Sequence, residues 1–433
     1  MREDKIVVSV TPTRIQRDSR SFKIAASITR FGYLSIVVEG DKSNLDRTHL
    51  PFELRSMARL YVTDEEAQTD STGTSPNQNL GRTIRKAWTL MRDHVPMFAV
   101  FPFLLRFVLA LKCTPRASLY YVHGVDCSPA ISFLCMIYRV PLIYDAHDFY
   151  AGMHSQTEMH TLSFARRWIT TFYRYLESRL IRKASAVVTV SSGVARLLHE
   201  TFGCKPIVVR NCHDLRLDRE PSAHLRQILG LSPDQYILVA VGNAKEGAAI
   251  REALDAMQDL PAHVHLVFLG RFFEPHMKSI GSRHLEDRVH VVPPVKPFEV
   301  VPFIRSADAS IILYYPMSVD YRNSLPNRFF QPLAAELPLL YPELPEIKRI
   351  AEKYDIGIPI NPQDSRSISN AVMKLANDPD IVTRYKRNLR AARDELSWEK
   401  EETILLNLIS TILAQKCPQY HTFEKRRFRS RRR

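Results

Sequence analysis

Short apolar runs of strand length recur along this chain, and segments with helical spacing separate them. The first unit lies near the amino terminus, where Lys5–Val10 and Leu34–Val38 are apolar runs and Phe22–Ile28 repeats its apolar residues at helical spacing. Asp18 stands where it can cap that helix, and Gly32 can end it. A strand, a helix and a second strand in this order predict a parallel sheet.

The alternation continues in two separate series. Further strands of the first series are expected at Leu119–Val122, Leu142–Tyr144, Ala186–Val190 and Pro206–Val209, with helices at Ala130–Tyr138 and from Gly193 to Phe202. Strands of the second series are expected at Tyr236–Val241, His263–Leu269, Val289–Val292, Ala309–Leu313 and Pro338–Leu340. A chain of 433 residues is also too long for one compact core. The pattern therefore predicts an α/β protein with two doubly wound parallel-sheet domains in tandem.

A polar stretch between the two series marks a domain boundary. We expect a first domain over residues 1–210, a linker over 211–230 and a second domain over 231–395, followed by a helix over 396–415 and a tail over 416–433. Ligands of open parallel sheets bind at the carboxyl ends of the strands, so we expect the site in a cleft between the domains.

Basic residues are concentrated at the carboxyl terminus. The formal net charge is +14, and Lys425–Arg433 alone carries seven positive charges and no negative one. Tails of this kind bind polyanions such as nucleic acid or anionic lipid. The chain has no RNA-binding motif that combines basic and aromatic residues, so nucleic acid is not expected as a partner.

The segment Met97–Leu111 is apolar except for Arg106, and it is shorter than the ~20 residues that span a bilayer. It is expected to be either a helix that lies on an anionic membrane surface or a buried helix of the first domain. The basic tail favours the membrane, because a polybasic segment gains ~1 kcal/mol per charge near such a surface. Between the early strands, Asp64–Asn79 is polar and predicts a loop.

The cysteine and glycine patterns exclude two kinds of site. None of the six cysteines forms a CxxC pair, which argues against a zinc ribbon. Neither GxxxxGK(S/T) nor GxGxxG occurs, which argues against a glycine-rich phosphate loop. The chain shows no signal peptide. We therefore expect a cytoplasmic protein with free thiols, able to lie at the inner face of the membrane.

Histidine and aspartate follow two strands of the first domain. His123 and Asp126 come after one strand, and His147 follows the next, with Asp145 and Asp148 on either side of it. Two such clusters at strand ends predict a polar reaction centre. The spacing of the two aspartates could hold a metal ion, but no other ligand set accompanies it, so no metal is expected.

Two further segments can bind anions. The loop Thr11–Arg20 carries three arginines after the first strand, which predicts either an anion or acceptor site or a solvated basic loop. In the second domain, Lys245 follows a strand and could meet a phosphate. Near Asn323–Leu340 a polar turn leads into a helix, whose first N–H groups could bind a diphosphate.

These strings, in this order, resemble the retaining glycosyltransferases of family 4, which have two Rossmann-like domains that face a cleft (the GT-B fold). The resemblance covers nearly the whole chain. It rests on RDSR at Arg17–Arg20, VHGVDCSPA at Val122–Ala130, IYDAHDFY at Ile143–Tyr150, ASAVVTVSSGVA at Ala184–Ala195, NSLPNRFFQPLAAELPLL at Asn323–Leu340 and SWEK at Ser397–Lys400.

The resemblance implies transfer of a hexosyl or N-acetylhexosaminyl group from a nucleotide-diphosphate sugar to a hydroxyl of a glycan or lipid-linked acceptor, with retention and without a metal. The first domain would take the acceptor, the second the donor, and the helix over 396–415 would cross back to the first domain. The implied catalytic residues are His123, Asp126 and His147, and the implied acceptor residues are Arg17, Asp18 and Arg20. The implied donor residues are Lys245, Asn323, Ser324, Leu325, Pro326, Asn327, Arg328 and Gln331.

The chain departs from the family pattern at four positions. Asn323 and Gln331 replace a pair of glutamates, Glu336 replaces a small glycine, and Asn243 replaces an arginine of the phosphate clamp. Gln331 can still bind a ribose hydroxyl, but without charge assistance. These departures leave open a non-catalytic scaffold, and the two-domain fold, which nucleotide-sugar epimerases can share, leaves open an epimerase.

Overall fold

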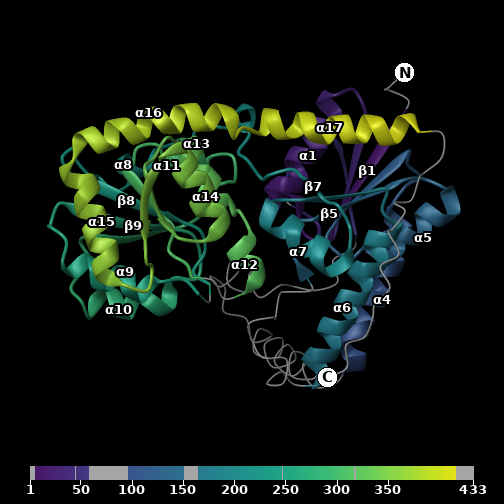
Figure 1. The fold of residues 1–433 in the computed structure, drawn as a ribbon, viewed down its shortest axis with the longest axis horizontal. Coiled ribbons are helices and arrows are strands. Elements are labelled where there is room, and N and C mark those ends of the chain that lie inside the picture. Colours follow the sequence, from purple (N-terminus) through teal and green to yellow (C-terminus); the bar gives the residue numbers. More distant parts are fainter. Residues whose placement is uncertain are drawn as a thin grey trace. The chain divides into compact units, whose positions relative to one another are not determined.

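The structure is a computed structural model of the chain, and it describes residues 5–43, 45–57, 96–150, 164–245, 247–315 and 318–415. It divides into two compact units (Figure 1). Of the described residues, those up to 189, 194–208 and 405–415 form the first unit, and 190–193 and 209–404 form the second. The predicted loop Asp64–Asn79 and the basic tail lie outside the described residues.

The first unit is built on a parallel sheet of seven strands in the order β3-β2-β1-β4-β5-β6-β7. The strands are β1 (Ile6–Thr11), β2 (Leu34–Glu39), β3 (Glu53–Ser56), β4 (Leu119–His123), β5 (Leu142–Ala146), β6 (Ala186–Thr189) and β7 (Ile207–Val208). Its helices are α1 (Ser19–Arg30), α4 (Pro96–Cys113), α5 (Ser128–Tyr138), α6 (Phe164–Lys183) and α7 (Ser192–Phe202). In the register of the sheet His123 pairs with Asp145, so the ends of β4 and β5 bring these residues together.

The capping prediction for the first helix is confirmed. The Asp18 carboxylate accepts a hydrogen bond from the backbone N–H of Ser21 at 3.0 Å, and α1 starts at Ser19, the residue after Asp18. This bond satisfies one of the N–H groups that a helix leaves free at its amino end. The cap also fixes Asp18 and Arg20 next to the carboxyl end of β1.

The second unit contains a parallel sheet of six strands in the order β10-β9-β8-β11-β12-β13. The strands are β8 (Tyr236–Val241), β9 (Val264–Leu269), β10 (Val289–Val292), β11 (Ala309–Ile311), β12 (Leu339–Pro342) and β13 (Gly357–Ile360). Its helices are α8 (Leu225–Ile228), α9 (Ile250–Gln258), α10 (Met277–Gly281), α11 (Val300–Ile304), α12 (Val319–Asn323), α13 (Asn327–Ala334), α14 (Pro345–Tyr354), α15 (Ser365–Asn377) and α16 (Pro379–Glu395).

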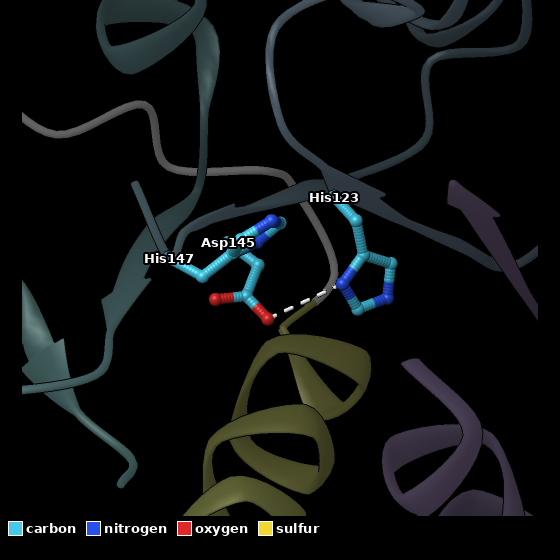
Figure 2. A group of neighbouring side chains, drawn as sticks. All are labelled: His123, Asp145 and His147. Carbon is cyan, nitrogen blue, oxygen red and sulfur yellow. Dashed lines mark ion pairs between the residues drawn. The ribbon is translucent and has the colours of Figure 1, made fainter. Parts of the chain in front are cut away.

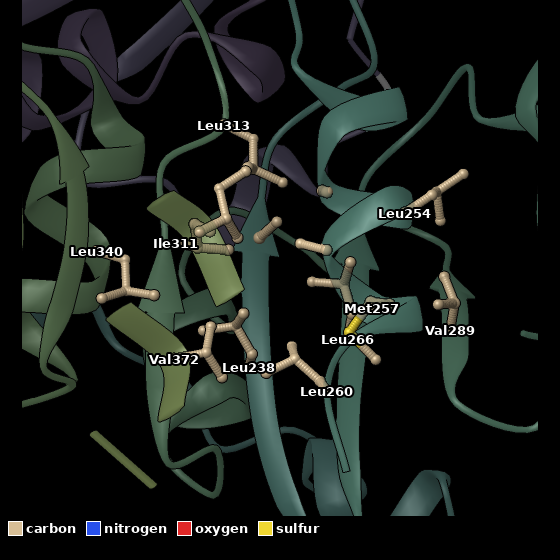
Figure 3. Packing of buried hydrophobic residues seen from close by; sticks show 14 of the residues in the cluster. Leu238, Leu254, Met257, Leu260, Leu266, Val289, Ile311, Leu313, Leu340 and Val372 are labelled. Atoms are coloured by element: carbon tan, nitrogen blue, oxygen red, sulfur yellow. The ribbon is translucent and has the colours of Figure 1, made fainter. Parts of the chain in front are cut away.

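Alternating strand residues of this sheet enter different cores. Leu238 and Leu266 pack with Leu254 and Met257 of α9 (Figure 3). Ile237 and Val239 belong to a separate core that includes residues of α11. A sheet covered on both faces explains why its strands read as continuous apolar runs.

The last helix, α17 (Trp398–Ala414), has residues in both units. In the second unit the Trp398 backbone N–H donates to the carbonyl of His213, and Glu401 pairs with Arg210. In the first unit Ser410 is hydrogen-bonded to Tyr33 at 3.2 Å.

The predicted fold class is confirmed, and two strands were missed. β3 is a short edge strand with exposed charged residues, and β13 carries glycine and proline, so neither has the apolar pattern of a central strand. The segment 211–230 packs within the second unit, where Leu225 is fully buried. Met97–Leu111 is helical, as part of α4. Among the described helices, none is both long and apolar enough to cross a bilayer.

Candidate active site

Three titratable side chains meet where β4 and β5 end in the first unit. His123 and Asp145 are fully buried, His147 is partly buried, and one ligand-type atom of each lies within 4.8 Å of the other two (Figure 2). His123 Nδ1 lies 3.3 Å from Asp145 Oδ2. The structure therefore joins the two predicted His/Asp clusters through Asp145.

Arg20 holds the central carboxylate of this cluster. Its Nε donates to Asp145 Oδ2 at 2.8 Å and its Nη2 donates to Oδ1 at 2.9 Å. The Tyr121 hydroxyl donates to Oδ2 at 3.2 Å. Burial alone would raise the pKa of Asp145, but Arg20 and His123 lower it well below its usual range. Asp145 is therefore a fixed anion, and Arg20 is engaged inside the protein rather than presented to an acceptor.

Asp18 adds a second, partly buried carboxylate beside the histidines. It accepts from the backbone and hydroxyl of Ser21 and from the Thr11 hydroxyl. Burial favours its neutral form, but His123 and His147 lower the pKa of Asp18 below its ordinary value. Arg17, by contrast, is exposed at the end of a short turn.

His147 is surrounded by carboxylates. Burial alone would lower the pKa of His147, but Asp148, Asp145 and Asp18 together raise it above its ordinary value. The ring lies 3.7 Å from Asp148, and its buried Nδ1 has no hydrogen-bond partner among the described residues. Because Asp18, Asp145 and Asp148 outnumber Arg20, a proton on His147 reduces the net negative charge of the cluster. Such an imidazolium can donate to an oxygen that gains negative charge.

The same residue types can bind metal ions, and the hydrogen bonds of Asp145 bear on whether an ion fits here. Both oxygens of Asp145 already accept from Arg20. A divalent ion would have to displace the guanidinium and remain next to its charge. The donor set is therefore better suited to a proton than to a metal ion.

Asp126 does not join this cluster. It accepts from the Tyr173 hydroxyl at 2.8 Å and lies 3.4 Å from Arg106 of α4. These contacts tie α4, α6 and the loop after β4 together. A direct role of Asp126 beside the histidines is not supported by this geometry.

In the second unit, Arg328 at the start of α13 is a guanidinium without a carboxylate partner among the described residues. It lies over the ring of Tyr314, 5.1 Å from the ring centroid. A Cβ on Gly242 would lie only 3.1 Å from its Nη2, so the arginine reaches the loop after β8. Burial lowers the pKa of Arg328. A desolvated cation of this kind is expected to bind an anion.

Arg328 lies in the first turn of α13, where the helix exposes its amino end. Pro326 is the residue before the helix, and no side chain caps the first turn. Asn327 is exposed and accepts from Asn211 at 2.6 Å. Helix amino termini bind phosphate groups through free N–H groups. The segment predicted to bind a diphosphate therefore contains Arg328 in the first turn of α13, and Ser324 lies just before that turn.

Other predicted donor residues fall into three groups. Asn323 is buried, its Nδ2 donates to the carbonyl of Val319, and its backbone carbonyl accepts from Ser191. Leu325 belongs to the hydrophobic core. Lys245 is exposed and Gln331 is partly exposed, without a hydrogen-bonding partner for either side chain in the described ranges.

Several neighbours of the site escaped sequence analysis. Ser191 and Gly193 contact Asn323, and Tyr314 supports Arg328. Ser191 is 132 residues from Asn323, and helix α12 separates Tyr314 from Arg328 in the chain, so no local spacing indicates these contacts. Two consecutive serines after β6, Ser191 and Ser192, are a signal in the sequence for the first of them.

Comparison with known proteins decides the class of the chain. Residues 62–217 match the model of Glycosyltransferase Family 4, and residues 222–392 match that of Glycosyl transferases group 1. The chain is a GT-B glycosyltransferase. No curated protein sequence matches it.

Solved structures of other glycosyltransferases share the fold of this one at low sequence identity. Sucrose-phosphate synthase from Thermosynechococcus elongatus is 14% identical, with a TM-score of 0.67 over 95% of this chain and 99% of that one. HepE of Anabaena, in complex with UDP-glucose, is 13% identical, with a TM-score of 0.66 over 94% and 100%. A glycosyltransferase from Rickettsia africae is 10% identical, with a TM-score of 0.66 over 95% and 99%.

Proposed function

We propose that this glycosyltransferase transfers a hexosyl or N-acetylhexosaminyl group from a nucleotide-diphosphate sugar to a hydroxyl group, with retention of anomeric configuration. The acceptor would be a glycan or a lipid-linked saccharide, and no metal would be required. Retention would follow if the acceptor hydroxyl attacks from the face that the diphosphate leaves.

The observation that carries the donor assignment is Arg328. A partly buried guanidinium beside the uncapped start of α13 matches what a leaving diphosphate needs. Lys245 is an exposed cation in the loop after β8, which Arg328 also reaches. We assign the phosphates to Arg328, the helix N–H groups and Lys245, and a ribose hydroxyl to Gln331. The complex of HepE with UDP-glucose makes UDP-sugars the first donors to test.

The first unit would supply the acid–base chemistry. His123 and a protonated His147 would face the sugar and acceptor, held in place by Asp145 and Arg20. Asn323 would act by supporting the loop before α13 rather than by direct contact, because its amide is already bonded to Val319.

We assign the place of action to a membrane surface at the cytoplasmic side, reached through α4 and the basic tail. This assignment follows from the apolar sequence of α4 and the seven charges of the last nine residues. Lipid-linked acceptors lie at such a surface.

Calorimetric titration with UDP-, GDP-, ADP- and TDP-sugars tests the donor assignment. One nucleotide class should bind selectively, and Arg328→Gln should weaken its binding about tenfold or more, because a charge-assisted bond contributes ~1.5–3 kcal/mol. Arg322→Gln is the matched control, since Arg322 is exposed on the neighbouring helix α12. Folded protein that binds no nucleotide would contradict the proposal and favour the scaffold alternative. Donor interconversion without an acceptor would favour an epimerase.

A further inference from the structure

The outer surface of α4, α5 and α6 is unusual for a protein surface in contact with water. Eight of the thirteen large hydrophobic residues recorded as exposed within the described ranges belong to these three helices. Leu104 and Val108 are 60% and 57% exposed, and Met136 and Ile137 are 60% and 53% exposed. Scattered exposed apolar residues need no explanation, but a concentration of them indicates an interaction site.

Contacts between aromatic side chains join the three helices. Phe103 of α4 contacts Phe172 and Tyr173 of α6, at centroid distances of 5.4 and 5.7 Å. Phe107 of α4 contacts Phe133 of α5 at 6.3 Å. The helices α4 and α6 lie side by side (Figure 1). We call the exposed residues of α4, α5 and α6 the helix face. Its exposed apolar residues include Leu104, Val108, Met136, Ile137 and Trp168.

The helix face has no acidic residue to balance its basic ones. Neither α4 nor α5 contains an aspartate or glutamate, and the one acid of α6, Glu177, is buried and accepts from Tyr144. The exposed side of α6 instead carries Arg167, Arg174, Arg179 and Arg182. Arg167 and Arg174 are seven residues apart, and Arg179 and Arg182 are three apart, so the members of each pair share a side of the helix.

The combination of arginines and exposed apolar residues on the helix face indicates what kind of partner it binds. Four exposed arginines, with no exposed acid on the described parts of α4, α5 and α6, are complementary to a polyanion. Exposed leucine, valine, methionine and isoleucine have no role on a phosphate backbone, whereas they can enter the boundary between lipid headgroups and acyl chains. Trp168 is 36% exposed at the side of α6, and tryptophan favours the same boundary.

We propose that the helix face docks this glycosyltransferase on an anionic lipid bilayer, with α4 and α5 inserting aliphatic side chains and α6 placing its arginines among the headgroups. The proposal deepens the membrane contact given above for α4 and the tail, and it requires neither a particular donor nor an intact donor site. The tail would add attraction but not insertion.

Vesicle binding of the full-length chain tests the proposal. We would measure partitioning to phosphatidylcholine vesicles with and without phosphatidylglycerol, and quenching of tryptophan fluorescence by brominated lipid, with Trp168→Phe as the reference. The apolar variant is Met136→Ser with Ile137→Ser. Its matched control is Ile228→Ser with Met277→Ser, two residues of the second unit that are 54% and 51% exposed.

The charge variant is Arg174→Glu with Arg179→Glu, and its control is Arg366→Glu with Arg387→Glu on exposed positions of α15 and α16. We expect each helix-face variant to reduce partitioning to anionic vesicles about tenfold. The controls should bind as the unchanged protein does, and the quenching should be lost with Trp168→Phe. Nucleotide binding, measured on the same samples, should not change.

Three results would overturn the proposal. The apolar variant could bind vesicles as well as the unchanged protein, which would leave only the basic tail as the membrane-binding segment. Brominated lipid could fail to quench Trp168. The charge variant could lose RNA binding while its vesicle binding stays intact, which would make the helix face a nucleic-acid surface. A failure of nucleotide binding in all samples would contradict the donor assignment alone.

Discussion

Arg20 and Asp145 form a buried, two-point ion pair across 125 residues of sequence, with Nε–Oδ2 and Nη2–Oδ1 distances of 2.8 and 2.9 Å. The side chains are 5% and 0% exposed. The pair joins the start of α1 to the end of β5, and the histidines of the candidate site lie against it.

Replacing Arg20 should destabilise the first unit strongly. Arg20→Leu leaves Asp145 as an uncompensated buried charge, so the free energy of unfolding should fall by about 3–5 kcal/mol. Arg20→Lys keeps the charge but loses the two-point geometry, and it should cost less. Urea unfolding followed by circular dichroism measures both. A loss below 1 kcal/mol for Arg20→Leu would show that Tyr121 and His123 suffice to stabilise the Asp145 carboxylate.

His147 should titrate above its ordinary pKa. Its folded pKa is raised, so the stability that its imidazolium contributes is fully present below the unfolded value of about 6.5. That stability is lost as the pH rises through the folded pKa. An NMR titration of the His147 ring should give a midpoint above 6.5, and Asp148→Asn should lower that midpoint. A midpoint at or below 6.5 in the unchanged protein would contradict the charge balance given for the cluster.

The second unit contains a pair of histidines whose pKa values are lowered, whereas the pKa of His147 is raised. His265 Nδ1 lies 3.0 Å from His290 Nε2, and His265 Nε2 lies 2.7 Å from Gln235 Oε1. Burial lowers the pKa of both histidines, and His290 and Arg288 lower that of His265 further. The unfolded chain therefore binds more protons, and stability is lost as the pH falls below about 6.5.

Unfolding measurements between about pH 5 and 7.5 check this prediction. The loss of stability on acidification should be smaller in His265→Gln with His290→Gln than in the unchanged protein. His284→Asn is the control, because His284 is exposed and asparagine tolerates its backbone angle φ of 53°. An equal loss in all three proteins would assign the acid sensitivity to other groups.

Gly270 should tolerate no side chain. A Cβ there would lie 2.2 Å from the backbone oxygen of Gly242, and backbone atoms cannot move aside cheaply. Gly270→Ala should therefore destabilise the second unit and, through the loop that Arg328 reaches, weaken nucleotide binding. Gly203→Ala is the comparison, because Gly203 has φ of +71° but open space around it, and it should cost only ~1 kcal/mol. An equal loss of unfolding free energy in both variants would contradict the close approach of Gly270 to the Gly242 backbone.

The spacing of apolar residues predicted most of the strands and helices, because buried parallel strands are continuous apolar runs in the sequence. It failed at β3 and β13, whose residues are exposed or include glycine and proline. For the site, strand ends indicated His123 and His147 correctly as neighbours. The sequence could not show that Arg20 binds Asp145 or that Asn323 is bonded internally, because both depend on how distant segments pack.

The most direct test of the account is NMR observation of the anomeric carbon during turnover of the best-binding nucleotide sugar. We predict that the first product, whether a glycoside or the free sugar from slow hydrolysis, has the same anomeric configuration as the donor, and that Arg328→Gln slows its formation while Arg322→Gln does not. A product of inverted configuration, or no cleavage by folded protein that binds the donor, would contradict retaining glycosyl transfer by this chain.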